Sequence, residues 1–170
     1  MSGHQAAHGT EPHEPVFTGR ALERLEALYP KYPTRQACLL PALWIIQEER
    51  GWISPQAMAE VGQVLGLTPA YVKGVVTFYT MYRQHPMGRH VIQVCTTSPC
   101  HLCGAADTLK AVLEQTGCGE LGTTSPDGRF TVLEVECLGA CGFPTPMLVD
   151  EDFVESVTPE NVATVLARYP

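Results

Sequence analysis

Two short cysteine-rich segments constrain the fold of this 170-residue chain more than any other feature. The first reads VIQVCTTSPCHLCG and places Cys95, Cys100 and Cys103 at C-x4-C-x2-C spacing. The second reads EVECLGACGFPTPM and places Cys137 and Cys141 at C-x3-C spacing. Each begins as an apolar strand pattern and continues into Gly, Pro, Ser and Thr, a loop composition whose backbone N–H groups can point at an anionic centre. We therefore expect two loops that together hold an iron–sulfur cluster.

Composition excludes several classes of function. The net charge is −7 and the 11 Lys and Arg residues are scattered, so no basic surface for nucleic acid or anionic lipid is expected. The longest apolar run, Ala37 to Ile46, is far shorter than the roughly 20 residues that span a bilayer. No secretory signal pattern opens the chain, so we expect a cytoplasmic protein whose clustered thiols bind metal rather than form disulfides.

The first half of the chain has helical periodicity. Residues 1–18 are rich in His, Gly, Pro and Glu without a hydrophobic period, which predicts a disordered arm. Residues 19–84 predict a helical bundle, because apolar side chains recur at helical spacing. Ser54 and Thr68, each followed by Pro, are expected to cap its third and fourth helices. Cys38 falls within the apolar pattern and is expected in the core.

The period changes after a turn-rich junction near residue 86. Residues 88–170 show the order strand, helix, strand, strand, helix, which predicts a small open sheet with helices packed on it. The aromatic run Phe78 to Tyr82, just before the junction, fits either internal packing or a partner-facing anchor. Cys118 follows the predicted helix and is expected to be a surface or half-buried thiol.

The residues alone leave several uses of the cysteines open. A 2Fe–2S cluster needs four thiolates, supplied either by Cys95, Cys100, Cys137 and Cys141 or by a plant-ferredoxin-like set that uses Cys103 in place of Cys141. The CxxC at Cys100 and Cys103 also fits a thioredoxin-like thiol–disulfide oxidoreductase. A four-cysteine zinc site is a further alternative, although only one cysteine pair has the C-x2-C spacing that zinc sites prefer.

The segments VCTTSPCHLCGA and VECLGACGFPTPM resemble the two ligand loops of the thioredoxin-like 2Fe–2S ferredoxin family. Upstream, LPALWIIQEERGWISPQAMAEVGQVLGLTPAYVKGVVTFYTMY resembles the helical unit that precedes the ferredoxin domain in that family. The resemblance extends from about Leu22 to Leu166. It implies an α+β protein, with an N-terminal helical bundle followed by a thioredoxin-like α/β ferredoxin domain.

The same resemblance implies a function. Family members of this shape include the small peripheral-arm subunit of respiratory complex I, and related subunits serve NAD-reducing hydrogenases and NAD-linked formate dehydrogenases. The implied ligands are Cys95, Cys100, Cys137 and Cys141, holding one 2Fe–2S cluster that exchanges single electrons with a flavin. FMN and NADH are expected on a partner subunit, and no catalytic site is expected on this chain. The implied location is the inner face of the cell membrane, reached through the complex.

Two positions depart from the family pattern. The family usually has a residue other than cysteine at Cys103, so this chain carries a spare thiol beside the site. In the second loop, Thr145 stands where the family commonly has proline, and Pro146 comes one residue later. Thioredoxin-like folds often have a cis proline facing the redox site, so we expect the Thr145–Pro146 bond to be cis.

Overall fold

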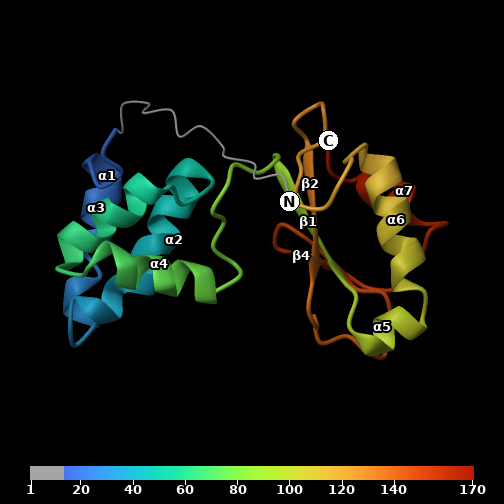
Figure 1. The fold of residues 1–170 in the computed structure, drawn as a ribbon, viewed down its shortest axis with the longest axis horizontal. Helices are drawn as coiled ribbons and strands as arrows, with labels where there is room; N and C mark the ends of the chain where they lie inside the picture. Colours follow the sequence, from blue (N-terminus) through green and yellow to red (C-terminus); the bar gives the residue numbers. More distant parts are fainter. Residues whose placement is uncertain (1–13) are drawn as a thin grey trace, which may run out of the picture. The chain divides into compact units, whose positions relative to one another are not determined.

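The computed structural model describes residues 14–170 and divides into two compact units, with the boundary between Pro86 and Met87. Figure 1 shows a first unit made of helices and a second in which helices pack on a sheet. Each unit has its own hydrophobic core. This is the α+β architecture that the sequence predicts.

The described residues of the first unit, 14–86, form four α-helices and two short 3-10 turns. They are α1 (Gly19–Glu26), η1 (Tyr29–Lys31), η2 (Gln36–Cys38), α2 (Leu39–Arg50), α3 (Pro55–Leu65) and α4 (Pro69–Phe78). The predicted caps are present, since the Ser54 side chain accepts a hydrogen bond from the Ala57 N–H and Thr68 accepts one from Tyr71. Cys38 is fully buried in the core, as expected.

The segment before α1 corrects the prediction of a disordered arm over residues 1–18. Residues 1–13 lie outside the described part of the chain, but Val16 and Phe17 are buried against the helices. Their backbone N–H groups donate to the two carboxylate oxygens of Glu60 on α3, at 3.0 Å and 2.8 Å. Arg50 at the end of α2 also donates to the Glu14 carbonyl at 2.7 Å. These partners lie 36 to 44 positions away in the sequence, so no local hydrophobic period could predict that the segment is held.

The aromatic run at the end of α4 is partly packed into the helical unit and partly exposed, so internal packing is confirmed for one of its residues and the partner-facing role stays a prediction. Tyr82 is buried, packs against Trp44 with 5.7 Å between ring centroids, and donates its hydroxyl proton to the Leu40 carbonyl at 3.0 Å. Phe78 and Met81 instead remain 77% and 49% exposed. The run therefore anchors the end of the helical unit while leaving large apolar side chains in solvent.

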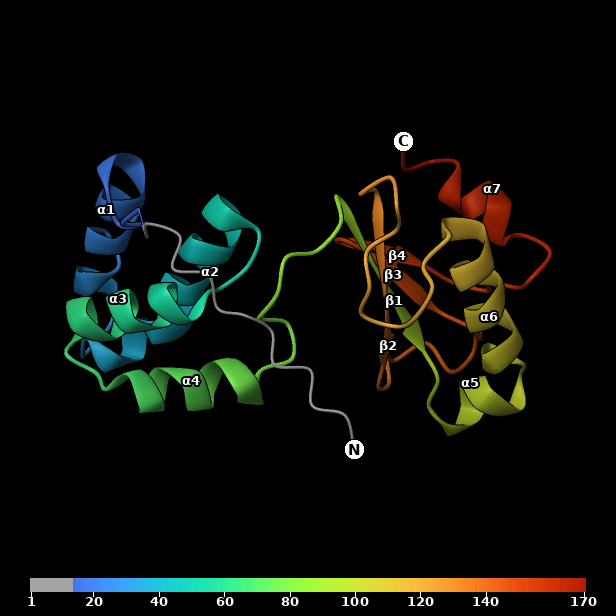
Figure 2. The ribbon, with the colours of Figure 1, turned by 45° about the horizontal axis from the view of Figure 1, so that its top comes forward.

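The second unit contains a four-stranded sheet with the strand order β2-β1-β3-β4. Its elements are β1 (His90–Cys95), α5 (Ser98–Leu102), α6 (Ala105–Thr116), β2 (Phe130–Val135), β3 (Met147–Val149), β4 (Asp152–Val154) and α7 (Val162–Leu166). β1 pairs with β2 in parallel, whereas β3 is antiparallel to β1 and to β4. α6 and α7 lie side by side against one face of the sheet, as both ribbon views show (Figures 1 and 2).

Two details of this unit differ from the sequence prediction. The helix predicted after the first cysteine loop is α6, and the short α5 precedes it. Gly104, with φ of +91°, separates α5 from α6. Cys118 is not a surface thiol: it is 4% exposed in the core under the sheet and its sulfur donates to the Phe130 carbonyl at 3.5 Å. Within residues 14–170, no helix is long and apolar enough to span a membrane.

The buried hydroxyl of Tyr82 should make the chain less stable as the pH becomes strongly alkaline. Burial, followed by the nearby Tyr79, raises the pKa of Tyr82 from 10.0 to about 12. Folding therefore favours the neutral phenol, and its contribution to stability is complete below pH 10 and is lost as the pH rises towards 12. We expect Tyr82→Phe to cost about 1 kcal/mol at pH 8 through the lost hydrogen bond.

Because phenylalanine cannot ionise, that deficit should shrink between pH 9 and pH 11. Urea unfolding of both proteins, followed by circular dichroism, measures the difference. A deficit that stays constant or grows over this range would contradict the pKa assignment.

Candidate metal centre

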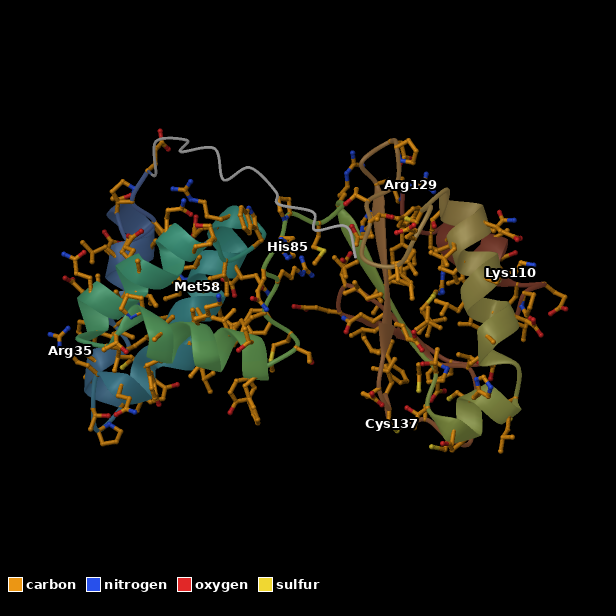
Figure 3. All side chains as sticks on the ribbon, in the orientation of Figure 1. Arg35, Met58, His85, Lys110, Arg129 and Cys137 are labelled. Carbon is orange, nitrogen blue, oxygen red and sulfur yellow. The ribbon has the colours of Figure 1, made fainter. Side chains whose placement is uncertain are left out.

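The two cysteine loops leave the sheet from the same end. β1 and β2 run in parallel with Cys95 opposite Val135, so the chain exits both strands at one edge of the unit. Two backbone bonds continue the pairing past the strands, from Thr96 N–H to the Val135 carbonyl and from Cys95 N–H to the Pro146 carbonyl, at 3.3 Å and 3.2 Å. Figure 3 shows Cys137 at this end of the sheet and Arg129 at the other.

The first loop buries two of its thiols. Thr97 takes an extended conformation, Pro99 lies in the first turn of α5, and the helix then carries Cys100 back towards Cys95. The two side chains are 1% and 2% exposed and form a small core with Ala105 and Leu138. The two thiols are close enough that each shifts the pKa of the other.

The second loop holds its thiols at the surface. Cys137 and Cys141 are both exposed, and Gly139 between them has a φ of +83° that favours glycine. This turn points the Gly139 N–H at the Cys137 sulfur at a distance of 3.3 Å. Cys137 also lies close enough to Cys141 to raise the pKa of its thiol, so the second loop presents a pair of neighbouring thiols as the first does.

The loops touch each other through Leu138. Leu138 packs against the small core of Cys95, Cys100 and Ala105, and its backbone lies where it favours the thiolate form of Cys95. Thr96 and Glu134, at the starts of the two loops, are joined by a hydrogen bond of 2.6 Å from the Thr96 hydroxyl to the carboxylate. We call the hydrogen bond between Thr96 and Glu134 the clamp. The sequence predicted neither the clamp nor the Leu138 contact, because each joins residues about forty positions apart.

The pKa values of the thiols reflect this crowding. Burial opposes ionisation of Cys95, but hydrogen bonds from Leu138 and Thr97 outweigh it and lower the pKa of that thiol. Burial, the hydrogen bond to Cys95 and the charges of the other loop's cysteines raise the pKa of Cys100 to about 11. The charge of Cys137 raises the pKa of Cys141. Four thiolates at this spacing repel one another, which a bound cation offsets.

The donor set fits a two-iron cluster better than a single metal ion. Within residues 14–170, no three His, Cys, Asp or Glu side chains gather closely enough around one point to hold a metal ion. Each loop instead contributes two neighbouring thiols, and the charges of Cys137 and Cys141 act on Cys100 in the other loop. A tetrahedral zinc ion needs four ligands around one centre, whereas each iron of a 2Fe–2S cluster takes two thiolates.

The remaining cysteines lie outside this group. Cys103 is the exposed C-cap residue of α5. Cys38 is buried in the core of the helical unit and Cys118 in the core of the second unit. A thiol–disulfide enzyme needs an accessible first cysteine with a lowered pKa. Cys100 is 2% exposed and its pKa is raised, so this CxxC lacks both properties.

The peptide expected to be cis is not. Among the described residues, the cis bond lies between Pro144 and Thr145, and the Thr145–Pro146 bond is trans. Backbone hydrogen bonds fix both residues: Val157 N–H donates to the Thr145 carbonyl at 2.9 Å and Cys95 N–H to the Pro146 carbonyl. Contacts with distant segments therefore set the path of this loop, and the positions of its prolines did not reveal it.

Comparison with known proteins agrees with this reading. The profile of the family described as "Thioredoxin-like [2Fe-2S] ferredoxin" matches residues 25–170. NADH-quinone oxidoreductase subunit 2 of Thermus thermophilus is 40% identical over 146 residues, which cover 84% of this chain and 80% of the relative. Mitochondrial NADH dehydrogenase [ubiquinone] flavoprotein 2 of Dictyostelium discoideum is 37% identical over 170 residues, covering 98% and 68% of the two chains.

Among solved structures, an NAD+-reducing [NiFe]-hydrogenase in its air-oxidised state is similar in fold, with a TM-score of 0.65 and 20% identity. That match covers 78% of this chain and 22% of the hydrogenase chain. The family match spans the cysteine loops, the sheet and all but the first helix, and the relatives extend the likeness over the whole helical unit. The chain therefore belongs to the thioredoxin-like 2Fe–2S ferredoxin family.

Proposed function

We propose that this chain is the electron-transfer subunit of an NADH-oxidising respiratory complex of the NADH:quinone oxidoreductase type. The observation that carries the proposal is the convergence of two thiol pairs, one from each loop, at one end of a parallel strand pair. Relatives that are 37–40% identical are named as subunits of NADH dehydrogenases, which supports the assignment. A small subunit of an NAD-reducing hydrogenase or NAD-linked formate dehydrogenase remains the second candidate, favoured by the fold of the hydrogenase chain.

In this proposal Cys95, Cys100, Cys137 and Cys141 are the cluster ligands. A bound 2Fe–2S cluster supplies one-electron carrier chemistry, and the chain supplies thiolates and a polar backbone around them. Neither loop contains Lys or Arg, so backbone N–H groups such as those of Leu138 and Gly139 provide the positive partial charges next to the sulfurs. They favour the thiolate form that metal binding requires.

The chain breaks no substrate bond in this proposal. FMN and NADH bind to a partner subunit, with which the cluster exchanges single electrons. The exposed side chains of the run Phe78 to Tyr82 belong to the surface that docks on that partner. The complex holds the chain at the inner face of the cell membrane, on the cytoplasmic side.

Single serine substitutions test the ligand set. Each of Cys95→Ser, Cys100→Ser, Cys137→Ser and Cys141→Ser removes one thiolate and should abolish or strongly reduce the cluster. Cys103→Ser and Cys118→Ser are matched controls that should keep visible absorption, iron and sulfide content and the paramagnetic signal of the reduced protein. Loss of the cluster in Cys103→Ser together with its retention in Cys141→Ser would establish the plant-ferredoxin-like set instead.

The metal content of the purified protein separates the rival chemistries. Protein made anaerobically with ample iron should contain iron and sulfide in equal amounts, two of each per chain, because a 2Fe–2S cluster has that composition. Zinc as the main metal would contradict the proposal, as would metal-free protein that catalyses disulfide exchange. Elemental analysis with an insulin-reduction assay distinguishes the three outcomes.

The clamp between Thr96 and Glu134 should govern how firmly the loops hold their metal. Glu134→Ala removes a charge-assisted hydrogen bond worth about 1–3 kcal/mol, so the cluster should assemble but bleach several times faster under a chelator. Glu151→Ala, at an exposed turn of the same unit, is the control and should bleach like the unaltered protein. Equal bleaching rates for all three proteins would remove the clamp from the account.

A further inference from the structure

The hydroxyl of Thr145 is buried without a hydrogen-bond partner among the described residues. Six polar side chains are buried in residues 14–170, and the other five all hydrogen-bond within the chain: Gln47, Thr108, Thr116, Ser125 and Thr131. Thr145 is only 1% exposed, so water does not replace the missing bond at the surface. Because burial strips a hydroxyl of its bonds to water, native structures seldom keep such a group unsatisfied.

The pairing of β3 with β1 fixes where this side chain lies. The bond from the Cys95 N–H to the Pro146 carbonyl extends the pairing one residue beyond Met147. One step further, Thr145 comes opposite Thr96, the residue that follows the first cysteine of the site. The residue before a proline is extended and side chains alternate along an extended chain, so Thr145 lies on the same face as Met147. That face packs against α6.

The side of α6 that covers this face passes from the sheet core to the cysteines. Val112 of α6 belongs to the same core as Met147. Ala105, at the start of the helix, packs instead with Cys95 and Cys100. The residues of α6 between these two layers are therefore next to the cysteine pocket on one side and next to the sheet core on the other.

Val157 ties Thr145 to the boundary between the two layers. Its carbonyl accepts a hydrogen bond from the Thr108 hydroxyl at 3.4 Å, and Thr108 is the buried residue of α6 between Ala105 and Val112. Its N–H donates to the Thr145 carbonyl at 2.9 Å. The backbone of Thr145 is thus held where the sheet core ends and the cysteine pocket begins, with an unused hydroxyl on its side chain.

Building on the proposed function, we propose that the Thr145 hydroxyl donates a hydrogen bond to a sulfur atom of the 2Fe–2S centre. Such a centre brings inorganic sulfide next to the four thiolates, and both kinds of sulfur accept hydrogen bonds. One-electron reduction, with the electron supplied by the flavin of the partner subunit, increases the negative charge beside the hydroxyl, which keeps its proton. The bond is therefore stronger in the reduced form and raises the reduction potential. Thr145 is in this way a positioning residue for the electron-transfer step.

Removal of the hydroxyl tests this role. Thr145→Val keeps the size of the side chain, and Thr145→Ala removes the hydroxyl by a second route. For both holoproteins, the ratio of reduced to oxidised cluster at a fixed potential should fall about fivefold, the effect of one hydrogen bond of ordinary net strength. For a one-electron couple this is a shift of about −40 mV. Thr145→Ser, which differs from Thr145→Ala by the hydroxyl alone, should stay within about twofold of the unaltered chain.

The matched control is Thr116→Val. Thr116 is also a buried threonine facing inward from α6, but it lies at the end of the helix away from the cysteines and its hydroxyl donates to the Val112 carbonyl at 2.8 Å. Its replacement should leave the potential unchanged. Double-resonance spectra of the reduced proteins in D2O give a second readout, because an exchangeable deuteron coupled to the cluster should be present with threonine or serine at position 145 and absent with valine or alanine.

The outcomes separate this inference from the proposed function. Intact clusters with unchanged potentials in both Thr145→Val and Thr145→Ala would refute the inference alone, as would an equal shift or loss of the cluster in Thr145→Ser. A cluster that Thr145→Ser retains and the other two variants lose would support it. A chain that takes up no iron and sulfide even with threonine at position 145 would refute the proposed function, and this inference with it.

Discussion

The parallel pairing of β1 with β2 is the constraint on which the site depends. Antiparallel neighbours would send the two cysteine loops to opposite edges of the sheet. When two parallel strands are joined by a crossover helix, the chain leaves both strands at the same end of the sheet. The register places Cys95 opposite Val135, two residues before Cys137. Four thiols separated by up to 46 positions in the sequence are thereby brought into electrostatic contact.

The loops then refine what the strands have brought together. Pro99 and the short α5 turn Cys100 inward, while the left-handed Gly139 turns the second loop around the Cys137 sulfur. The two loops contain no Lys or Arg, so the dipoles of backbone amides, such as the Gly139 N–H at the Cys137 sulfur, supply positive partial charge next to the sulfurs. One thiol pair is buried and the other exposed, so the site is fixed on one side and accessible on the other. An electron carrier needs both properties.

Sequence patterns predicted the parts of this fold that are governed by local rules. Helix caps at Ser54 and Thr68 are short-range interactions, and the strand and loop spacing of the cysteines is readable from one segment at a time. Long-range contacts escaped prediction for the same reason. Glu60 holding the segment before α1, Cys118 turned into the core, and the Leu138 contact to Cys95 each depend on residues that are neighbours only after folding.

Iron anomalous scattering from crystals of the anaerobically purified chain tests the central claim most directly, because it locates metal without reference to any assigned ligand. Two iron positions per chain are predicted, one next to Cys95 and Cys100 and the other next to Cys137 and Cys141. A single metal position, or an iron coordinated by Cys103, would contradict the account.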